Sequence, residues 1–466
     1  MTTDLALATA AELSALYAAR KASPVETMTA VLARAEQVNP RLNALTRVDT
    51  DDSLAAARVS EARWRAGAPL SPLDGVPVSI KELVRTAGWP LSMGSRLTDK
   101  SPAAEDAPAV SRLREAGAIV FAQSASPEYG YKGVTDSPLH GITRNPWNPE
   151  RTPGGSSGGA GAAVAAGLGP LAIGTDGGGS VRIPASMCGL VGLKATFGRV
   201  PAWPASMHGD LANTGPMTRT AVDCALMMNA LARPDPRDPF ALPPDGVDYA
   251  ATLDRPLAGR KVAFMLHQGD HPLDEQVQAR VTAAAETLEE LGCVVEEAEA
   301  PFDSDEAGGV WAVHWMSSIQ RLLQLYPEDR HSDFDPGLLE QARIGASFTV
   351  KTLVDAQARR REIAHRWNLF FERYDFAIGP TLAVTPWGVG RNLPDGPDGK
   401  PNLNWARTVA YNLTRHPAVS VPCGLSADGL PIGLQIAAGL YKDAEVLAAA
   451  AAFEKARPFP FPVLPA

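Results

Sequence analysis

The chain has 466 residues and a formal net charge of −9 at pH 7. This length allows either about three average domains or one large α/β domain. The acidic balance argues against a nucleic-acid-binding protein, whose usual mark is a strongly basic patch. A hydrophobic content of 45% with 20% charged residues is typical of a globular protein, and it excludes disorder across much of the chain.

The four cysteines form no CxxC pair, which excludes a zinc ribbon and a thioredoxin-like motif. Sparse cysteines in a large chain are typical of free thiols in a reducing compartment. The first 26 residues lack a basic stretch followed by an apolar run, so they do not resemble a signal peptide. No apolar run of about 18 residues occurs. We therefore expect a cytoplasmic protein that contacts neither membrane nor nucleic acid.

The N-terminal region is predicted to be helical. Thr9 and Ser23 each stand three residues before a glutamate, which is the capping-box spacing at a helix start. Apolar patterning then predicts a strand at 75–80, a helix at 108–116 and a strand at 118–122.

The second half of the chain alternates in the same way. Five prolines at 233–246 indicate a long loop. Residues 261–266, 277–291 and 293–295 then have a strand–helix–strand pattern, which normally places both strands parallel in one sheet. Residues 307–374 are predicted to be mostly helical.

The chain closes with one more loop, strand and helix, predicted at 386–404, 430–437 and 443–456. In the helical region before them, Trp311, His314 and Trp315 allow two interpretations. They pack in a helical core, or they line a substrate pocket.

Residues 154–180 contain eleven glycines, a density that requires backbone freedom or close approach. Their apolar interior is expected to be buried, with serines at both ends. No lysine follows the glycines as in a phosphate-binding loop, and a dinucleotide fingerprint is disfavoured. The segment 154–158 matches the GxSxG nucleophile elbow, which needs a later acid and histidine, and His416 is the candidate histidine.

A serine hydrolase with a lysine base is the remaining interpretation. A serine hydroxyl needs an adjacent base to become a good nucleophile. Lysine serves when desolvation lowers its pKa, and Lys81 directly follows an apolar strand. The alternative for Lys81 is an ordinary solvated charge.

Several long motifs in the right order resemble the amidase signature family. They are GVPVSIKELVRTAG at 75–88, RNPWNPERTPGGSSGG at 144–159, the glycine-rich run at 154–200 and GPMTRTAVD at 215–223. The resemblance is strongest over about residues 70–223. It implies one α/β domain spanning 1–466, with a large twisted mixed sheet flanked by helices on both faces and a variable substrate-side region at about 300–400.

The resemblance also implies a Ser–Ser–Lys triad that forms an acyl-enzyme. Ser180 is the nucleophile, Ser156 is the bridging serine with a cis peptide bond, and Lys81 is the base. The implied oxyanion hole consists of the backbone N–H groups of Gly177, Gly178, Gly179 and Ser180. Ser157, Asp176 and Arg182 are supporting residues, and Lys194 takes a structural place. Gly177 stands where the family usually has a bulkier residue, which is expected to loosen the oxyanion loop.

The resemblance implies an amidase that cleaves a small aryl or aliphatic amide, an anilide or a related carbamate. Tyr129, Gly130, Trp311 and Trp315 are the candidate pocket residues. No metal or organic cofactor is implied, and a monomer or homodimer is expected. Three alternatives stay open: a glutaminase-type subunit of an amidotransferase, a Ser–His–Asp α/β-hydrolase using His416, and a binding protein that retains the scaffold.

Overall fold

A computed structural model describes residues 4–462, and within them eleven strands form one mixed sheet while β4 and β5 form a separate pair. The strands are β1 (Leu45–Val48), β2 (Pro77–Lys81), β3 (Ile119–Ser124), β4 (Asp136–Ser137), β5 (Gly141–Ile142), β6 (Leu171–Asp176), β7 (Val191–Lys194), β8 (Asn213–Thr218), β9 (Lys261–Phe264), β10 (Val294–Glu297), β11 (Phe376–Pro380), β12 (Ala418–Leu425) and β13 (Pro431–Ala438).

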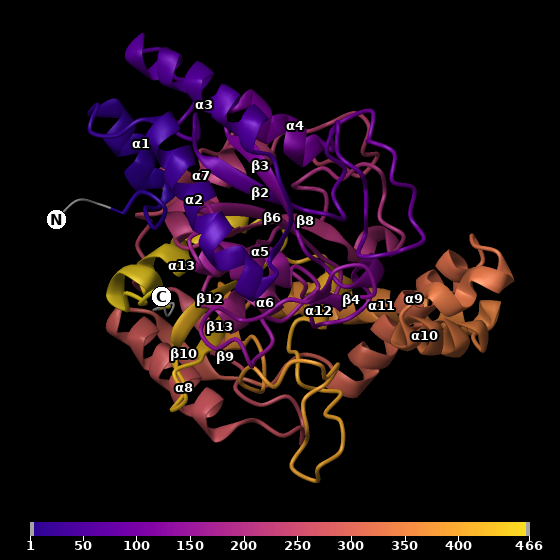
Figure 1. Ribbon diagram of the computed structural model, residues 1–466. Helices are drawn as coiled ribbons and strands as arrows, with labels where there is room; N and C mark the ends of the chain where they lie inside the picture. The colour runs from indigo at the N-terminus through magenta and orange to yellow at the C-terminus, as the bar shows by residue number, and fades with distance from the viewer. Residues whose placement is uncertain (1–3, 463–466) are drawn as a thin grey trace.

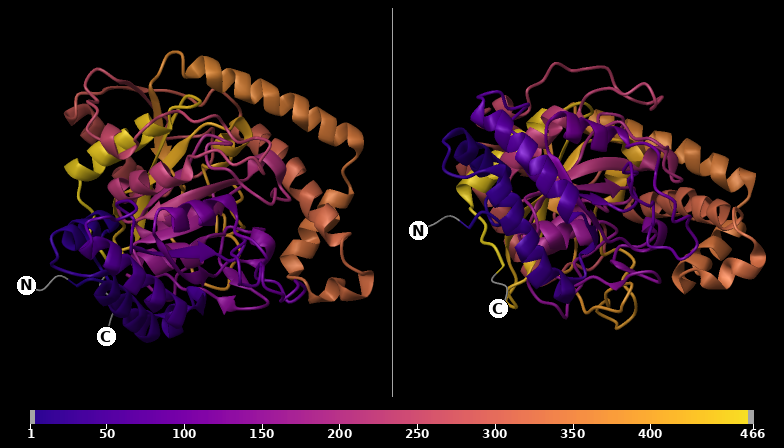
Figure 2. Two further views of the ribbon diagram at one scale, coloured as in Figure 1. Left: turned by 90° about the horizontal axis from the view of Figure 1, so that it is seen from above. Right: turned by 45° about the horizontal axis from the view of Figure 1, so that its top comes forward.

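Helices connect and cover these strands (Figure 1). They are α1 (Ala10–Ala18), α2 (Pro24–Leu42), α3 (Thr50–Arg65), α4 (Pro108–Glu115), α5 (Gly158–Ala165), α6 (Arg182–Cys188), α7 (Ala221–Leu231), α8 (Glu275–Glu290), α9 (Ser304–Leu323), α10 (Pro336–Ala346), α11 (Val350–Phe370), α12 (Val409–Thr414) and α13 (Asp443–Ala456). Figure 2 shows α9, α10 and α11, in orange, projecting to one side of the rest of the chain.

The sheet order is β1-β3-β2-β6-β8-β7-β12-β13-β11-β9-β10. β2 pairs in parallel with β3 and β6, and β9 pairs in parallel with β10 and β11, whereas the strands between these groups are antiparallel. The mixed sheet is therefore as expected. The predicted parallel strand–helix–strand unit is confirmed as β9–α8–β10.

Both faces of the sheet are covered because side chains alternate along each strand. On β3, Val120 packs in a cluster that includes residues of α4, α7, α8 and α13. Its neighbours Ile119 and Phe121 pack in a different cluster, with residues of α2, α3 and α5. The single α/β domain with helices on both faces is thus confirmed.

Local sequence signals agree with the elements near the N-terminus. Thr9 and Ser23 cap α1 and α2, and both capping boxes are present. The predicted helix at 108–116 is α4, and the chain leaves it through Gly117 in a left-handed conformation. The helical region at 307–374 consists mainly of α9, α10 and α11. None of the helices within residues 4–462 combines the length and apolar character needed to span a bilayer.

Candidate active site

The carboxyl ends of two adjacent parallel strands bring the predicted lysine and the glycine-rich turn together. Ile80 of β2 pairs with Ile173 of β6, β2 ends at Lys81, and β6 ends at Asp176. Helix α5 packs against both strands, and Ser156 lies just before its start. Carboxyl ends of parallel strands are where α/β sheets place their ligand sites.

Lys81 is fully buried, and its Nζ donates three hydrogen bonds, all to hydroxyl oxygens. The acceptors are Ser156 Oγ at 2.7 Å, Ser157 Oγ at 2.9 Å and Thr175 Oγ1 at 2.9 Å. Because an ammonium has three N–H donors, this set satisfies all of them. Thr175 was not anticipated from the sequence, although it stands directly before the predicted Asp176.

Burial lowers the pKa of Lys81 to about 7, although the negative charges of Asp176 and Glu82 favour the ammonium form. A large fraction of the molecules therefore carries a neutral amine near neutral pH. Such an amine can accept a proton from a hydroxyl in contact with it. The alternative of a solvated surface lysine does not hold.

The two serine-bearing loops lie against each other. The backbone N–H of Ser157 donates to the carbonyl oxygen of Ser180 at 3.2 Å. The Gly155–Ser156 peptide bond is cis, as the resemblance implies. The Ser180 hydroxyl makes no hydrogen bond to any residue of the described chain, and Ser180 is 8% exposed.

The turn from Asp176 to Ser180 is fixed through its carbonyl groups, each of which accepts a hydrogen bond. The donors are Asn412 Nδ2 to Asp176 (3.0 Å), Trp311 Nε1 to Gly177 (2.9 Å), Thr408 Oγ1 to Gly178 (2.6 Å), the Ile183 N–H to Gly179 (2.6 Å) and the Ser157 N–H to Ser180 (3.2 Å). These five hydrogen bonds oppose the loosening expected from Gly177, which stays a prediction.

The N–H groups of the same turn differ from one another. That of Gly179 donates to Asp176 Oδ1 at 2.8 Å. Those of Gly177, Gly178 and Ser180 have no acceptor among residues 4–462. Successive unpaired N–H groups in a turn form a concavity that attracts negative charge. Three of the four predicted oxyanion donors are thus free to bind, and the fourth is already engaged.

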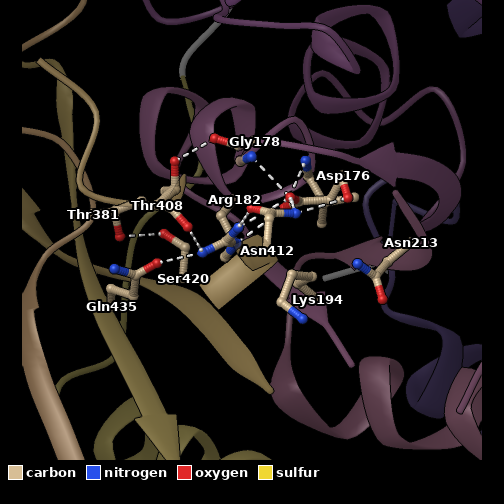
Figure 3. Close-up of polar contacts among 12 residues, drawn as sticks. Asp176, Gly178, Arg182, Lys194, Asn213, Thr381, Thr408, Asn412, Ser420 and Gln435 are labelled. Carbon is tan, nitrogen blue, oxygen red and sulfur yellow. Dashed lines mark hydrogen bonds and ion pairs between the residues drawn. The ribbon is translucent and has the colours of Figure 1, made fainter. Parts of the chain in front are cut away.

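A buried ion pair anchors this turn to the C-terminal part of the chain (Figure 3). Arg182 donates from Nε and Nη2 to the two carboxylate oxygens of Asp176, both at 3.0 Å. Its other hydrogen bonds go to Thr408, Asn412 and Gln435. Burial would raise the pKa of Asp176. The positive charge and hydrogen bonds of Arg182, together with the hydrogen bond from Asn412, outweigh this effect and hold the pKa of Asp176 at about 2. The predicted supporting pair is therefore in contact, and it stays ionised.

Gly130, Trp311 and Trp315, three of the predicted pocket residues, lie beside the two serine-bearing loops. A Cβ atom on Gly130 would stand 3.1 Å from Ser156 Oγ. A Cβ on Gly177 would stand 2.9 Å from the Trp315 ring, and one on Gly178 would stand 2.7 Å from the Trp311 ring. Trp315 is buried, as the core interpretation expects, whereas Trp311 is partly exposed, and its place in a substrate pocket stays a prediction.

Tyr129 and His314 face neighbouring elements. The hydroxyl of Tyr129 is hydrogen-bonded to that of Tyr326, and its ring packs near Phe334. Tyr129 therefore joins the loop before Gly130 to the segment between α9 and α10. Burial lowers the pKa of His314, and the positive charge of Arg360 on α11 lowers it further.

His416, the histidine of the alternative hydrolase, and Lys194, the lysine expected to be structural, lie in other surroundings. His416 is buried, its Nδ1 is hydrogen-bonded to Thr414 Oγ1 at 2.9 Å, and its ring packs against Phe371. Within residues 4–462 it bonds neither a carboxylate nor a serine, so no Ser–His–Asp arrangement is formed. Lys194 Nζ donates to the Ala195 carbonyl at 2.8 Å.

Sequence reasoning missed Thr408, Asn412 and Gln435. Each lies more than 200 positions from the turn that it helps to hold, so no local spacing indicates it. Within the described residues, no group of three or more His, Cys, Asp or Glu side chains could hold a metal ion.

Comparison with known proteins agrees with this fold along the whole chain. A family model described as Amidase matches residues 26–447. An acylamidase of Rhodococcus erythropolis is 37% identical over 97% of this chain and 95% of its own. A glutamyl-tRNA(Gln) amidotransferase subunit of Cupriavidus taiwanensis is 34% identical over 96% and 95%. A solved bacterial aryl acylamidase of the amidase signature enzymes matches with a TM-score of 0.89 and 34% identity, over 97% and 96%.

These full-length matches, together with the mixed α/β sheet, define an enzyme that hydrolyses amide bonds. The chain belongs to the amidase signature family.

Proposed function

We propose that this enzyme hydrolyses small aryl or aliphatic amides, including anilides and related carbamates, through an acyl-enzyme on Ser180. The observation that carries the chemistry is the 2.7 Å hydrogen bond between Ser156 Oγ and the buried Nζ of Lys81, whose pKa is about 7. The acylamidase relatives support the substrate class. The partly exposed indole of Trp311, beside Gly178, also suits a planar aryl group.

The reaction begins with two proton transfers. Neutral Lys81 accepts the hydroxyl proton of Ser156, and Ser156 Oγ accepts that of Ser180. Ser180 Oγ then attacks the amide carbonyl carbon, and a tetrahedral intermediate with a negative oxygen forms. When this intermediate collapses, the carbon–nitrogen bond breaks and the amine leaves with a proton returned through Ser156. Water then hydrolyses the Ser180 ester and releases the acid.

The negative oxygen of the intermediate is stabilised by the free N–H groups of the turn. Those of Gly177, Gly178 and Ser180 are the available donors, because that of Gly179 is bound to Asp176. Loss of one such donor typically costs about 100- to 1000-fold in rate. The absence of side chains on both glycines lets the substrate carbonyl approach the backbone closely.

The nucleophile is tested with a fluorophosphonate probe followed by peptide mass spectrometry. We expect the probe to label Ser180, and we expect Ser180→Ala to lose acyl-enzyme formation with a fall in kcat of about 10⁴- to 10⁶-fold. A matched control is Ser347→Ala, which changes an exposed serine at the end of α10 whose hydroxyl donates to the Ile344 carbonyl. Labelling that persists at another serine in folded Ser180→Ala would contradict the assignment.

The second candidate function is that of a glutaminase which passes ammonia to a partner chain. The full-length similarity to a glutamyl-tRNA(Gln) amidotransferase subunit favours it. Assays with acetanilide, an aliphatic amide, an aryl carbamate and glutamine separate the two functions. Efficient glutamine hydrolysis with a co-purifying second subunit would favour the amidotransferase, whereas aryl amide turnover by the chain alone would favour the amidase.

We also propose that these steps need no metal or organic cofactor, and that the enzyme acts as a monomer or homodimer in the cytoplasm. The location is supported by the cysteines, which are free thiols throughout the described chain.

A further inference from the structure

One of the hydrogen bonds that fix the oxyanion turn comes from the variable part of the chain. Thr408 and Asn412, which hold the Gly178 and Asp176 carbonyls, stand at the start of α12 and inside it (Figure 3). Trp311, which holds the Gly177 carbonyl, stands on α9 in the projecting helical region. The indole N–H of Trp311 therefore links that region directly to the proposed oxyanion hole.

The direction of this hydrogen bond decides where the next N–H points. A trans peptide group is planar, and its C=O and N–H point in opposite directions. Because the Gly177 carbonyl points toward the indole of Trp311, the N–H of Gly178 points away from it. Gly178 is partly exposed, whereas the other four residues of the turn are buried. Its N–H has no acceptor within residues 4–462.

The missing side chain at Gly177 makes room for this arrangement. A Cβ atom there would lie 2.9 Å from Cζ3 of Trp315, closer than two such carbon atoms approach. Trp315 in turn stacks on Trp311, with ring centroids 4.8 Å apart, and on His208, with centroids 3.5 Å apart. The space of a side chain at position 177 is thus filled by a stack of rings, and this stack packs against the indole that binds the turn.

We propose that Trp311 is a positioning residue of the oxyanion hole: its indole N–H fixes the Gly177–Gly178 peptide so that the Gly178 N–H meets the substrate oxygen. Trp315 takes the space of the absent side chain at Gly177 and keeps Trp311 in place. This role rests on the proposed function, and it differs from lining a substrate pocket because it acts in the transition state.

The test uses Trp311→Phe, which keeps an aromatic ring and removes the N–H donor. We expect single-turnover acylation by an aryl acetamide to fall about 10- to 100-fold, less than for a deleted donor, with KM within threefold of wild type. A trifluoromethyl ketone, which forms a tetrahedral oxyanion on a serine, should bind more weakly by the same factor. The corresponding alcohol, which forms no such adduct, should bind equally to both proteins.

Trp64→Phe is the matched control, because the Trp64 indole N–H also donates to a backbone carbonyl, that of Asp74, at 2.9 Å. Asp74 lies before β2, at the end of that strand opposite to Lys81. This variant should keep the acylation rate and the ketone-to-alcohol affinity ratio. In Gly177→Ala the added methyl group displaces Trp315 and thereby disturbs the ring stack. This variant should lower the ketone-to-alcohol affinity ratio although Trp311 is intact.

The outcomes separate the positioning role from its alternatives. A raised KM with an unchanged ketone-to-alcohol ratio in Trp311→Phe would show that Trp311 only lines the pocket, and would overturn the proposal. An unchanged ratio in Gly177→Ala would overturn the role of Trp315. If wild type itself bound ketone and alcohol equally, the Ser180 mechanism would fail, and the positioning role would fall with it.

Discussion

Two buried lysines, each with a pKa lowered by burial, lie in different surroundings in this enzyme. Lys81 and Lys194 are both fully buried at the ends of strands, and burial is the largest cause that lowers the pKa of each to about 7. Lys81 faces three hydroxyl groups, whereas Lys194 donates to the backbone carbonyl of Ala195. Figure 3 shows Lys194 pointing away from the bonded group around Arg182.

The difference shows that burial lowers the pKa of a lysine but is not sufficient to make it a general base. A neutral amine acts as a base only when the group beside it has a proton to give. A serine hydroxyl provides such a proton, and a backbone carbonyl does not. Contact with Ser156, and not the pKa, therefore distinguishes the proposed catalytic lysine from the structural one.

Replacing each lysine by methionine tests this distinction with the largest effect. Methionine fills a similar volume without a basic group, so a cavity is avoided. We expect Lys81→Met to lower single-turnover acylation by about 10³- to 10⁴-fold, the upper range for a general base. Lys194→Met should stay within about threefold of wild type, because no reacting group contacts Lys194. Circular dichroism and gel filtration verify that both variants are folded.

Lys81→Arg is a stricter variant, since a guanidinium keeps the positive charge and does not become a neutral base at any pH used for enzyme assays. It should be as inactive as Lys81→Met. Near-normal acylation in Lys81→Arg, or equal losses in Lys81→Met and Lys194→Met, would remove the distinction between the two lysines.

The pH profile gives the next largest effect. The proposed base must be neutral, so log kcat/KM should rise with pH below about 7 and level off above it. The carboxylate of Glu82 favours the ammonium form of Lys81, so Glu82→Gln should move this limb to lower pH. Lys194→Met should leave the limb in place. A limb that disappears in Lys194→Met would show that the wrong lysine has been assigned.

Much of the fold follows from local patterns, and the missed strands show where such patterns fail. The capping residues Thr9 and Ser23 mark their helices because the signal lies within one turn. Strand β8, by contrast, contains Gly215 and Pro216, which usually indicate a turn. It forms a strand because β6 and β7 pair with it on both sides. Tertiary pairing overrides propensity there.

The candidate site divides in the same way. Lys81, Ser156 and Ser180 could be predicted as the triad because long motifs surround them. The loosening expected from Gly177 considered the turn alone, without the hydrogen bond from Trp311. In the structure, Trp311 and Thr408 hold the carbonyls of Gly177 and Gly178 from 134 and 230 positions away. Contacts at such separations depend on the whole fold, so the sequence pattern of the turn cannot reveal them.

The smallest expected effect is on stability, where the two lysines should behave alike. Each has a folded-state pKa of about 7, whereas the pKa of an unfolded lysine is about 10.4. Between these values the unfolded chain holds a proton that the folded chain lacks, so the free energy of unfolding rises with pH. Each lysine should contribute about 1 kcal/mol per pH unit to this slope.

Urea unfolding of wild type, Lys81→Met and Lys194→Met at pH 7.5, 8.0 and 8.5 measures the slope. In each variant the pH slope of the free energy of unfolding should fall by the contribution of one lysine, and the fall should be the same in both variants. Burial also raises the pKa values of Cys188 and Cys224, which lowers stability at higher pH, but this contribution is common to all three proteins and cancels in the differences. If Lys81→Met and Lys194→Met change the pH slope of unfolding equally but differ in acylation rate, the effect of burial is separated from that of catalysis. Both lysines are buried, but of the two only Lys81 contacts the serine hydroxyls. A wild-type slope retained in Lys194→Met would mean that Lys194 stays charged in the folded protein.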